Sequence, residues 1–309
     1  MKKSAVIVCL LSVGLLLLSG MKMQAETESR KVQTPPVSAR SSRTGSQIPD
    51  IPEYCIFAGD TIRFDNDDMR ERLDRELIAF TFSHSTSILM LKRAPKYFPI
   101  VEPVIRSYGM PDDIKYLMVI ESNLDPRAVS TAGAAGLWQF TEATGRQYGL
   151  EVNSNIDERY NIEKATAAAL KYLKAAYGKY GDWLTVAASY NAGQNRISSE
   201  IVKQREEKAV DLLLPNETSR YIFRLLAAKM MFENPQAFGF TLSPDELYRP
   251  TPVRQKVETT DEIPNLVDFA EKYGISYYEL KNANPWLRED KLKNSSHRLY
   301  IISIPVVGK

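Results

Sequence analysis

Apolar residues recur at intervals of three and four along most of the chain between residues 66 and 231. This spacing places apolar side chains on one face of an α-helix, whereas a half-buried strand alternates at every second residue. We find no convincing strand before residue 240, so the pattern predicts an entirely helical region. It is clearest in the segment that begins at Asn66, in Ile162–Tyr177 and in Glu217–Met231.

Capping residues and prolines predict where the helices begin and end. Asp65 or Asn66 can cap the first helix, and Asp182 can cap a short helix with the sequence WLTVAASY. Pro95 and Pro99 are expected to interrupt the helical pattern. Proline in a helix interior removes a hydrogen bond and clashes with the preceding turn.

The N-terminus has the features of an export signal. Lys2 and Lys3 precede the apolar run Ala5–Leu18, and Ala25 supplies the small residue expected at a cleavage site. The run is shorter than the roughly 20 residues that a membrane-spanning helix needs. We therefore predict a signal peptide over residues 1–25.

Two alternatives concern this N-terminal segment. An apolar stretch extended to Met23 would serve as an uncleaved anchor. Residues 18–21 resemble the box that precedes the lipid-bearing cysteine of bacterial lipoproteins, but Met21 stands at the cysteine position. A thioether cannot be acylated in that way, so no lipid anchor is expected, and peripheral association with a membrane stays open.

Changes in composition divide the rest of the chain into five segments. Ser, Thr, Pro and charged residues dominate the first, which we expect to be a disordered or extended tether. An N-terminal helical arm, a main helical region, a linker and a C-terminal unit follow. Their expected bounds are 26–52 for the tether, 53–94 for the arm, 95–240 for the main region, 241–252 for the linker and 253–306 for the C-terminal unit.

Charge, cysteine and histidine content narrow the classes of function. The net charge is +2, and three of the lysines lie in the predicted signal peptide, so the mature chain is nearly neutral and nucleic-acid binding is not expected. Loss of Cys9 with the signal peptide leaves Cys55, which excludes an internal disulfide. The two histidines, His84 and His297, are far apart in sequence. We therefore predict no zinc site, no Ser-His-Asp triad and no cofactor.

Glu121 follows the apolar run Tyr116–Ile120 at the end of a helix that Pro111 opens. Burial among apolar side chains and a position at a helix C-terminus both disfavour the carboxylate, so both raise its pKa toward neutrality. A general acid needs such a pKa, because it must hold a proton and then donate it. Taken alone, a Glu at a helix end is more often a solvated surface residue.

Four motifs occur in order: Glu121-Ser122, Gly136-Leu137-Trp138-Gln139-Phe140, Ser189-Tyr190-Asn191-Ala192-Gly193 and Glu217-Thr218-Ser219-Arg220-Tyr221. Each is weak alone, but in this order and spacing they resemble the signature of the lytic transglycosylases, over about residues 95–232. The resemblance implies a mainly α fold with a lysozyme-like catalytic domain over 95–240. It also implies a monomeric enzyme of the periplasm or cell envelope that acts on the glycan strands of peptidoglycan.

The resemblance further implies a mechanism with one catalytic carboxyl group, that of Glu121. Glu121 protonates the oxygen between N-acetylmuramic acid and N-acetylglucosamine, and the C6 hydroxyl of the muramic acid attacks C1. Ordinary glycosidases need a second carboxylate, about 5 Å away in retaining enzymes and about 6.5–9.5 Å away in inverting ones. Asp125, Glu142 and Asp157 are the candidates, and none is expected to be a nucleophile. We expect Asp125 to cap a turn, Glu142 to lie in the first turn of a helix and Asp157 to lie in an exposed loop.

The other motif residues acquire roles by analogy with the family. The hydroxyls of Tyr190 and Tyr221 are expected to steady Glu121, and the amides of Gln139 and Asn191 to bind acetamido groups. Ser122 is expected to bind Glu121 or the sugar, with a plain helix-end serine as the alternative. The predicted substrate-binding residues are thus Ser122, Gln139, Tyr190, Asn191 and Tyr221.

Three glycines and one tryptophan complete the predicted site. Gly133 and Gly136 are expected to let the backbone approach the glycan, although a plain turn also favours glycine. Gly193 is expected to serve the turn after its helix. Trp138 is expected to belong to the core, with stacking on a sugar ring as the second interpretation.

The C-terminal unit is expected to fold as β-α-α-β. Its stretch Ile263–Pro285 resembles the helix–turn–helix of LysM modules, which bind glycans containing N-acetylglucosamine. Two departures from that family bear on binding: Glu258–Glu262 replaces the usual Gly-Asp, and residues 286–296 precede the last strand as an insertion. A structural cap on the catalytic domain is the alternative role.

Two rival functions fit the same sequence. One is a lysozyme-type muramidase that uses water, and the other is an inactive cell-wall-binding protein that keeps the fold. The mass of the released fragments distinguishes all three, because an anhydro end is lighter than a reducing end by one water and an inactive protein releases nothing.

Overall fold

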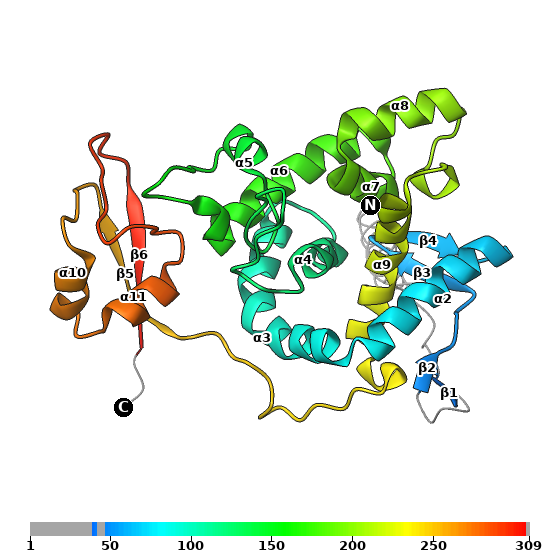
Figure 1. Cartoon of the computed structure of the whole chain (residues 1–309), viewed down its shortest axis with the longest axis horizontal. Helices are drawn as coiled ribbons and strands as arrows, with labels where there is room; N and C mark the ends of the chain where they lie inside the picture. Colours follow the sequence, from blue (N-terminus) through cyan, green and yellow to red (C-terminus); the bar gives the residue numbers. More distant parts are fainter. Residues whose placement is uncertain (1–38, 42–46, 307–309) are drawn as a thin grey trace, which may run out of the picture. The chain divides into compact units, whose positions relative to one another are not determined.

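The computed structural model describes residues 39–41 and 47–306 (Figure 1). The predicted signal peptide and much of the predicted tether lie outside the described residues, so both stay predictions. In the described part of the chain, no helix has both the length and the apolar character that crossing a membrane requires.

Two strand pairs precede the first helix, so the prediction of an entirely helical region before residue 240 is wrong. Strand β1 (Ala39–Ser41) pairs antiparallel with β2 (Gln47–Pro49). Strand β3 (Tyr54–Phe57) pairs with β4 (Asp60–Arg63) around Ala58-Gly59, where both residues have positive φ. Such a backbone suits a two-residue hairpin turn, whose twist matches that of the strands. Burial alternates along β3, but four residues are too few for that alternation to stand out in the sequence.

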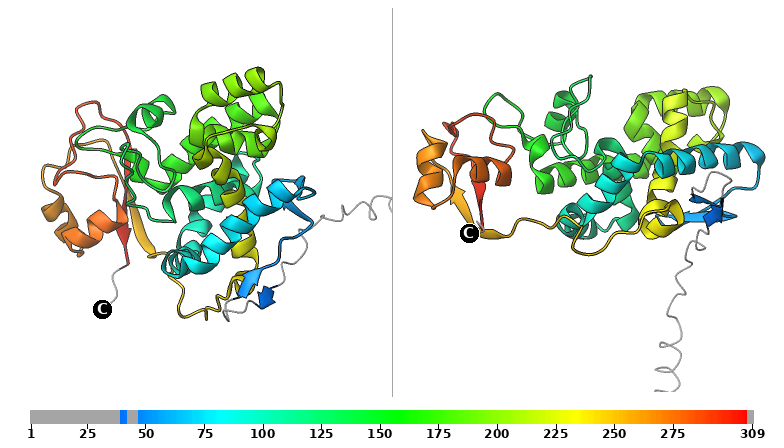
Figure 2. Two further views of the ribbon diagram at one scale, coloured as in Figure 1. Left: turned by 45° about the vertical axis from the view of Figure 1, so that its right-hand side comes forward. Right: turned by 60° about the horizontal axis from the view of Figure 1, so that its bottom comes forward.

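The arm and the main region are built mostly from helices, and several of these contact α9. The helices are α2 (Asp67–Phe82), α3 (His84–Ser107), α4 (Lys115–Ser122), α5 (Glu142–Gln147), α6 (Ile162–Tyr180), α7 (Trp183–Ala192), α8 (Gln194–Gln204) and α9 (Asn216–Glu233), with 3-10 helices η1 (Asp112–Ile114), η2 (Glu158–Tyr160), η3 (Ala209–Asp211) and η4 (Pro235–Phe238). Helix α9 contacts α2, α4 and α7, and it lies beside α2 in the views of Figures 1 and 2. The predicted caps are confirmed, because Asn66 accepts from Met69 N at 2.8 Å and Asp182 accepts from Thr185 N at 2.7 Å.

Helix α3 is continuous through Pro95, Pro99 and Pro103, so the predicted interruption is wrong. The three prolines are four residues apart and therefore follow one side of the helix. The buried residues, which include Tyr97 and Val101, lie on the other side. Packing of that buried face outweighs the local cost of the prolines, as tertiary contacts often do with propensity.

Residues 253–306 form the predicted β-α-α-β unit. Strands β5 (Val253–Thr259) and β6 (Tyr300–Pro305) pair antiparallel, and helices α10 (Leu266–Lys272) and α11 (Tyr277–Ala283) lie between them in sequence. Ser276 begins α11 with a capping box. Most of the residues of its apolar core lie in the unit itself, and the connection over residues 241–252 contains neither helix nor strand.

A loop of the main region, residues 151–161, contacts the C-terminal unit. Its Ile156 forms an isolated β-bridge with Leu287, and the backbone N–H of Asp157 donates to the carbonyl of Trp286 at 2.9 Å. Ile156 is 1% exposed and packs in the same apolar cluster as the core of the C-terminal unit. The unit is therefore docked on the main region as well as connected to it by the chain.

Charged groups reinforce this docking. Glu158 is 1% exposed, and it accepts hydrogen bonds from Arg298 of the C-terminal unit, at 3.2 Å, and from Lys164. Arg298 also binds Glu151 at 2.8 Å, and the hydroxyl of Tyr300 donates to Glu151 at 2.8 Å. The buried carboxylate of Glu158 thus has two cationic partners, one from each side of the contact.

Substitution of Arg298 tests whether these contacts hold the unit in place. We expect Arg298→Ala to lower the free energy of unfolding by about 1 kcal/mol, because hydrogen bonds to charged groups are lost while Lys164 still pairs with Glu158. The loss should shrink at high salt, since Arg298 is partly exposed. Urea unfolding measures both effects, with Arg254→Ala as the control, because Arg254 bonds within its own unit to Tyr273. Equal losses in the two variants would contradict the docking role.

Candidate active site

Glu121 occupies the last turn of α4, as predicted. Residues 116–120 before it are all buried, and Asn123 ends the helix in the left-handed conformation with a φ of 51°. Glu121 itself is only half-buried, so part of its side chain meets solvent while protein surrounds the rest. The helix therefore presents one carboxyl group at the edge of an apolar core.

The hydroxyl of Tyr221 donates a hydrogen bond to Glu121 Oε1 at 2.6 Å. Burial is the largest influence on the Glu121 carboxyl group and raises its pKa from 4.5 to about 7. The hydrogen bond from Tyr221 and the charge of Arg224 lower the pKa, whereas the charge of Glu217 raises it. Of the two causes predicted from the sequence, burial is the main one. At neutral pH a large share of Glu121 is protonated and able to donate.

Three residues of α9 act on Glu121, namely Glu217, Tyr221 and Arg224. They are four and three residues apart, which places them on the same face of a helix. The sequence predicted a role for Tyr221 but not the influence of the other two. The spacing around Tyr221 was the available signal, and it becomes informative only once Tyr221 is known to face Glu121.

Tyr190 lies near Glu121 but uses its hydroxyl elsewhere. The hydroxyl donates to the carbonyl of Trp138 at 2.7 Å. Of the two tyrosines predicted to contact Glu121, Tyr221 is therefore the one that makes the hydrogen bond. Burial, and then the charge of Glu121, raise the pKa of Tyr190 well above its usual value. Tyr190 is therefore a neutral side chain beside Glu121, and its hydroxyl also fixes the loop that carries Trp138.

Asn191 and Ser122 make contacts inside the protein. Asn191 Oδ1 accepts from the Thr218 hydroxyl at 2.9 Å, which ties α7 to the start of α9. The Ser122 hydroxyl donates to the carbonyl of Met118 at 3.1 Å, one turn earlier in α4. For Ser122 this is the arrangement of the plain helix-end alternative, so its predicted contact with Glu121 or sugar stays a prediction.

The segment 133–140, called the glycine loop below, carries Gln139. The φ of Gln139 is 48°, in the left-handed region that few residues other than glycine adopt. Its side-chain nitrogen donates to the carbonyls of Ala128 and Gly136, at 3.1 and 2.8 Å. These two bonds fix the amide against its own loop, and they offset part of the backbone strain.

The predicted turn and core residues of the site differ in what they contact. Gly133, Gly136 and Gly193 all have positive φ, as turns require. A Cβ at Gly136 would lie 2.1 Å from the carbonyl oxygen of Arg159. Glycine is therefore needed here because the backbone of Arg159 passes close to it. Trp138 is fully buried and donates to Thr166 Oγ1 at 2.9 Å, which confirms the core role.

The three candidate second carboxylates are engaged in structural contacts. Asp125 accepts from the backbone of Arg127 at 3.0 Å, and Glu142 lies in the first turn of α5, so both expectations are confirmed. The expectation of an exposed loop for Asp157 is wrong. Asp157 is only 6% exposed, because it caps η2 and pairs with Arg159 at 2.7 Å. Neighbouring residues in the sequence could not reveal the contact of Asp157 with Trp286 of the C-terminal unit.

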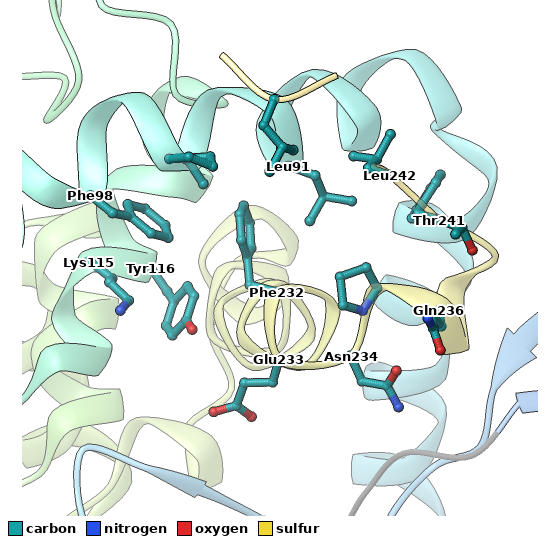
Figure 3. A pocket seen from close by; sticks show the side chains of 15 residues that line it. Leu91, Phe98, Lys115, Tyr116, Phe232, Glu233, Asn234, Gln236, Thr241 and Leu242 are labelled. Atoms are coloured by element: carbon teal, nitrogen blue, oxygen red, sulfur yellow. The ribbon is translucent and has the colours of Figure 1, made fainter. Parts of the chain in front are cut away.

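Figure 3 shows a cavity of about 700 Å³ whose lining does not include Glu121. Its lining comes from α3, the start of α4, the end of α9, the start of η4 and residues 240–247. The rings of Phe98, Tyr116 and Phe232 stand together in it, with centroids 5.5–6.4 Å apart. None of the predicted site residues lines it, so it is separate from the candidate active site.

Comparison with known proteins identifies two domains in the chain. Residues 102–212 match the family described as the transglycosylase SLT domain, and residues 255–308 match the soluble lytic transglycosylase C-terminal LysM-like domain. With the mainly helical fold, these matches indicate a lysozyme-like SLT domain followed by a LysM-like domain.

The chain is homologous to membrane-bound lytic murein transglycosylase D of Escherichia coli K12. The two are 29% identical over 272 residues, which is 85% of this chain and 58% of that protein. The chain therefore spans just over half the length of this relative. Peptidoglycan transglycosylase gp16 of Escherichia phage T7 is 42% identical over 81 residues, or 26% of this chain and 6% of that protein.

Alignment with solved structures gives a looser match. The 70 kDa soluble lytic transglycosylase from Escherichia coli aligns with a TM-score of 0.41 and 17% identity, over 60% of this chain and 34% of that chain. The lytic transglycosylase Slt inactive mutant from Pseudomonas aeruginosa aligns with a TM-score of 0.38 and 19% identity, over 49% and 26%.

The pKa of Glu121 provides a direct test of the site. We expect Tyr221→Phe to raise this pKa above about 7, because a hydrogen bond that favours the carboxylate is removed. Tyr190→Phe should leave the pKa of Glu121 unchanged, since the Tyr190 hydroxyl bonds to the carbonyl of Trp138. Carboxyl ¹³C chemical shifts followed through a pH titration measure it, with Glu121→Gln to assign the signal. A lower pKa in Tyr221→Phe would contradict the assignment.

The raised pKa also predicts how stability depends on pH. A carboxyl group with a pKa of about 7 when folded and 4.5 when unfolded stabilises the fold fully below 4.5, and this contribution is lost as pH rises to about 7. At 1.36 kcal/mol per unit the loss is about 3 kcal/mol. Glu121→Gln should therefore gain about 3 kcal/mol in relative stability between pH 4 and pH 8. Urea unfolding at both pH values checks this, and a constant difference between the proteins would contradict it.

Proposed function

We propose that this chain is a peptidoglycan lytic transglycosylase that cleaves the β-1,4 bond between N-acetylmuramic acid and N-acetylglucosamine without water. The observation that carries the proposal is the carboxyl group of Glu121, which burial keeps substantially protonated near neutral pH while Tyr221 fixes its position. The SLT and LysM-like domain matches and the homology to a lytic murein transglycosylase support the same activity.

The proposed reaction uses Glu121 twice. Glu121 first donates its proton to the glycosidic oxygen as the bond from that oxygen to C1 breaks. The C6 hydroxyl of the same muramic acid then forms a bond to C1, and its proton passes to the Glu121 carboxylate. The product is a 1,6-anhydro sugar, and Glu121 returns to its starting state. Because the attacking oxygen belongs to the substrate, enforced proximity replaces a protein nucleophile.

The contacts of the other acidic residues fit this single-carboxyl mechanism. Asp125, Glu142 and Asp157 are each held by an arginine or by backbone N–H groups. Glu217 is the acidic residue whose charge raises the pKa of Glu121, and it is exposed at the start of α9. We infer that a water-using muramidase would use Glu217 as its base, because its charge acts on Glu121, so substitution of Glu217 separates the two enzyme hypotheses.

Digestion of purified cell wall followed by mass spectrometry tests the reaction. We expect fragments with 1,6-anhydro ends, lighter by one water than reducing ends, and we expect Glu217→Gln to release the same anhydro product. Reducing ends that disappear in Glu217→Gln would favour the muramidase. No release from the unaltered chain would favour an inactive wall-binding protein.

Substitution of the acid itself should separate catalysis from binding. We expect Glu121→Gln to lower the cleavage rate by at least 10²–10⁴-fold, because amide nitrogen cannot donate as the carboxylic acid does. Binding to insoluble cell wall should persist, and the rate of the unaltered enzyme should fall above pH of about 7, where the acid loses its proton. Sedimentation with cell wall measures binding. A cleavage rate in Glu121→Gln within a few-fold of the unaltered rate would remove Glu121 from the mechanism.

We further propose where the chain acts and how its C-terminal domain contributes. The N-terminal signal predicted for residues 1–25 and the peptidoglycan substrate favour the periplasm or cell envelope, with the chain acting as a monomer. The contacts of residues 151–161 with Trp286, Leu287 and Arg298 support a structural cap, whereas the LysM-like match supports glycan binding. The two roles are compatible, because docking uses only part of the domain's surface.

A further inference from the structure

Both ends of the glycine loop meet at one side chain, that of Arg159. Its Nη1 donates to the carbonyl of Gly133 at 2.9 Å and to the carbonyl of Phe140 at 3.2 Å. The Phe140 carbonyl also accepts from the backbone of Ala135 at 2.9 Å, so it is the point where the loop closes on itself. A single nitrogen of Arg159 therefore bridges the two ends of the segment that carries Gln139.

Asp157 fixes the orientation of the Arg159 guanidinium. Nε donates to Oδ1 at 2.9 Å and Nη2 donates to Oδ2 at 2.7 Å, which leaves Nη1 for the loop. The two side chains are only 10% and 9% exposed. Paired bonds of this kind hold a planar guanidinium in one geometry, which a lysine cannot reproduce.

The backbone of Arg159 also supports the loop. Its carbonyl oxygen would lie 2.1 Å from a Cβ at Gly136, so the two backbones are in direct contact. Gly136 in turn accepts one of the two hydrogen bonds from the Gln139 amide, at 2.8 Å. The segment around η2 is thus in direct contact with the glycine loop through both the backbone and the side chain of Arg159.

We propose that Arg159 is a positioning residue that holds the glycine loop, and with it Gln139, in the conformation that binds the sugar. The identity of the ligand rests on the proposed function, but the mechanical role of Arg159 does not. Arg159 touches no reacting atom in this scheme. It acts by joining the two ends of a loop with a strained residue at position 139, while Tyr190 and Thr166 hold the middle of the loop through Trp138.

Arg159→Lys is the principal test, because it keeps the positive charge and removes the guanidinium that bonds to Asp157 and to the loop at the same time. Arg146→Lys is the matched control, since Arg146 pairs with Glu142 on α5 and donates to Val152 without touching the glycine loop. Asp157→Asn is a second variant that keeps the arginine and weakens its orientation. Circular dichroism verifies that each variant is folded.

Amide hydrogen exchange gives a readout that does not depend on activity. In Arg159→Lys we expect the amides of Ala135 and Gln139 to exchange about tenfold faster or more, with a smaller increase in Asp157→Asn and none in Arg146→Lys. The amides of α9 should be unchanged in all three. Unchanged loop exchange in folded Arg159→Lys would overturn the proposal, and so would an equal increase in Arg146→Lys.

Kinetics on soluble glycan strands then connect the loop to the substrate. We expect kcat/KM of Arg159→Lys to fall by about 10–100-fold, as displacement of a binding group commonly causes, with most of the change in KM. The alkaline limb of the pH profile should stay in place, because Arg159 does not act on Glu121. A fall confined to kcat, or a shifted limb, would overturn the positioning role. If the unaltered chain cleaves no glycan, the proposed function fails while hydrogen exchange still decides the role of Arg159.

Discussion

The hydrogen bond from Tyr221 to Glu121 joins α9 to α4 across 100 positions of sequence, and the candidate site depends on it. The carboxyl group must be surrounded by protein to keep its proton near neutral pH, yet it must also be held in one orientation. Burial meets the first need. The Tyr221 hydroxyl meets the second but opposes the first, since a hydrogen bond to the carboxylate lowers its pKa. The balance between these two effects yields an acid suited to neutral pH.

The end of α4 shows how the fold places that carboxyl group. Helix α4 has eight residues, too few for stability as an isolated helix, so its contacts with α9 must hold it. Asn123 and Leu124 both adopt positive φ, which ends the helix directly after Ser122. A non-glycine residue in that conformation costs about 1–2 kcal/mol. Leu124 is fully buried, and its packing offsets this strain.

Local patterns were sufficient to predict much of the fold and the position of Glu121 at the end of an apolar helix. Helix caps such as Asn66 and Asp182, and the apolar run before Glu121, depend on spacing within a few residues, which a sequence shows directly. The errors arose where distant contacts decide. Packing of one face keeps α3 helical through its prolines, and Asp157 lies against a domain that begins some hundred residues later. The partner of Tyr190, the carbonyl of Trp138, could not be predicted for the same reason.

The loop of residues 151–161 changes how the C-terminal domain is to be understood. A flexibly tethered binding module raises the local concentration of a catalytic site along a polymer, and its effect depends on linker length. Here Glu151 and Glu158 bind Arg298, while Asp157 binds both the Trp286 carbonyl and Arg159. The docked domain and the glycine loop are therefore supported by neighbouring residues of one segment. A glycan bound by such a domain would meet the active site in a fixed geometry, so the orientation of the docked domain, rather than linker length, would decide which bond of the strand reaches Glu121.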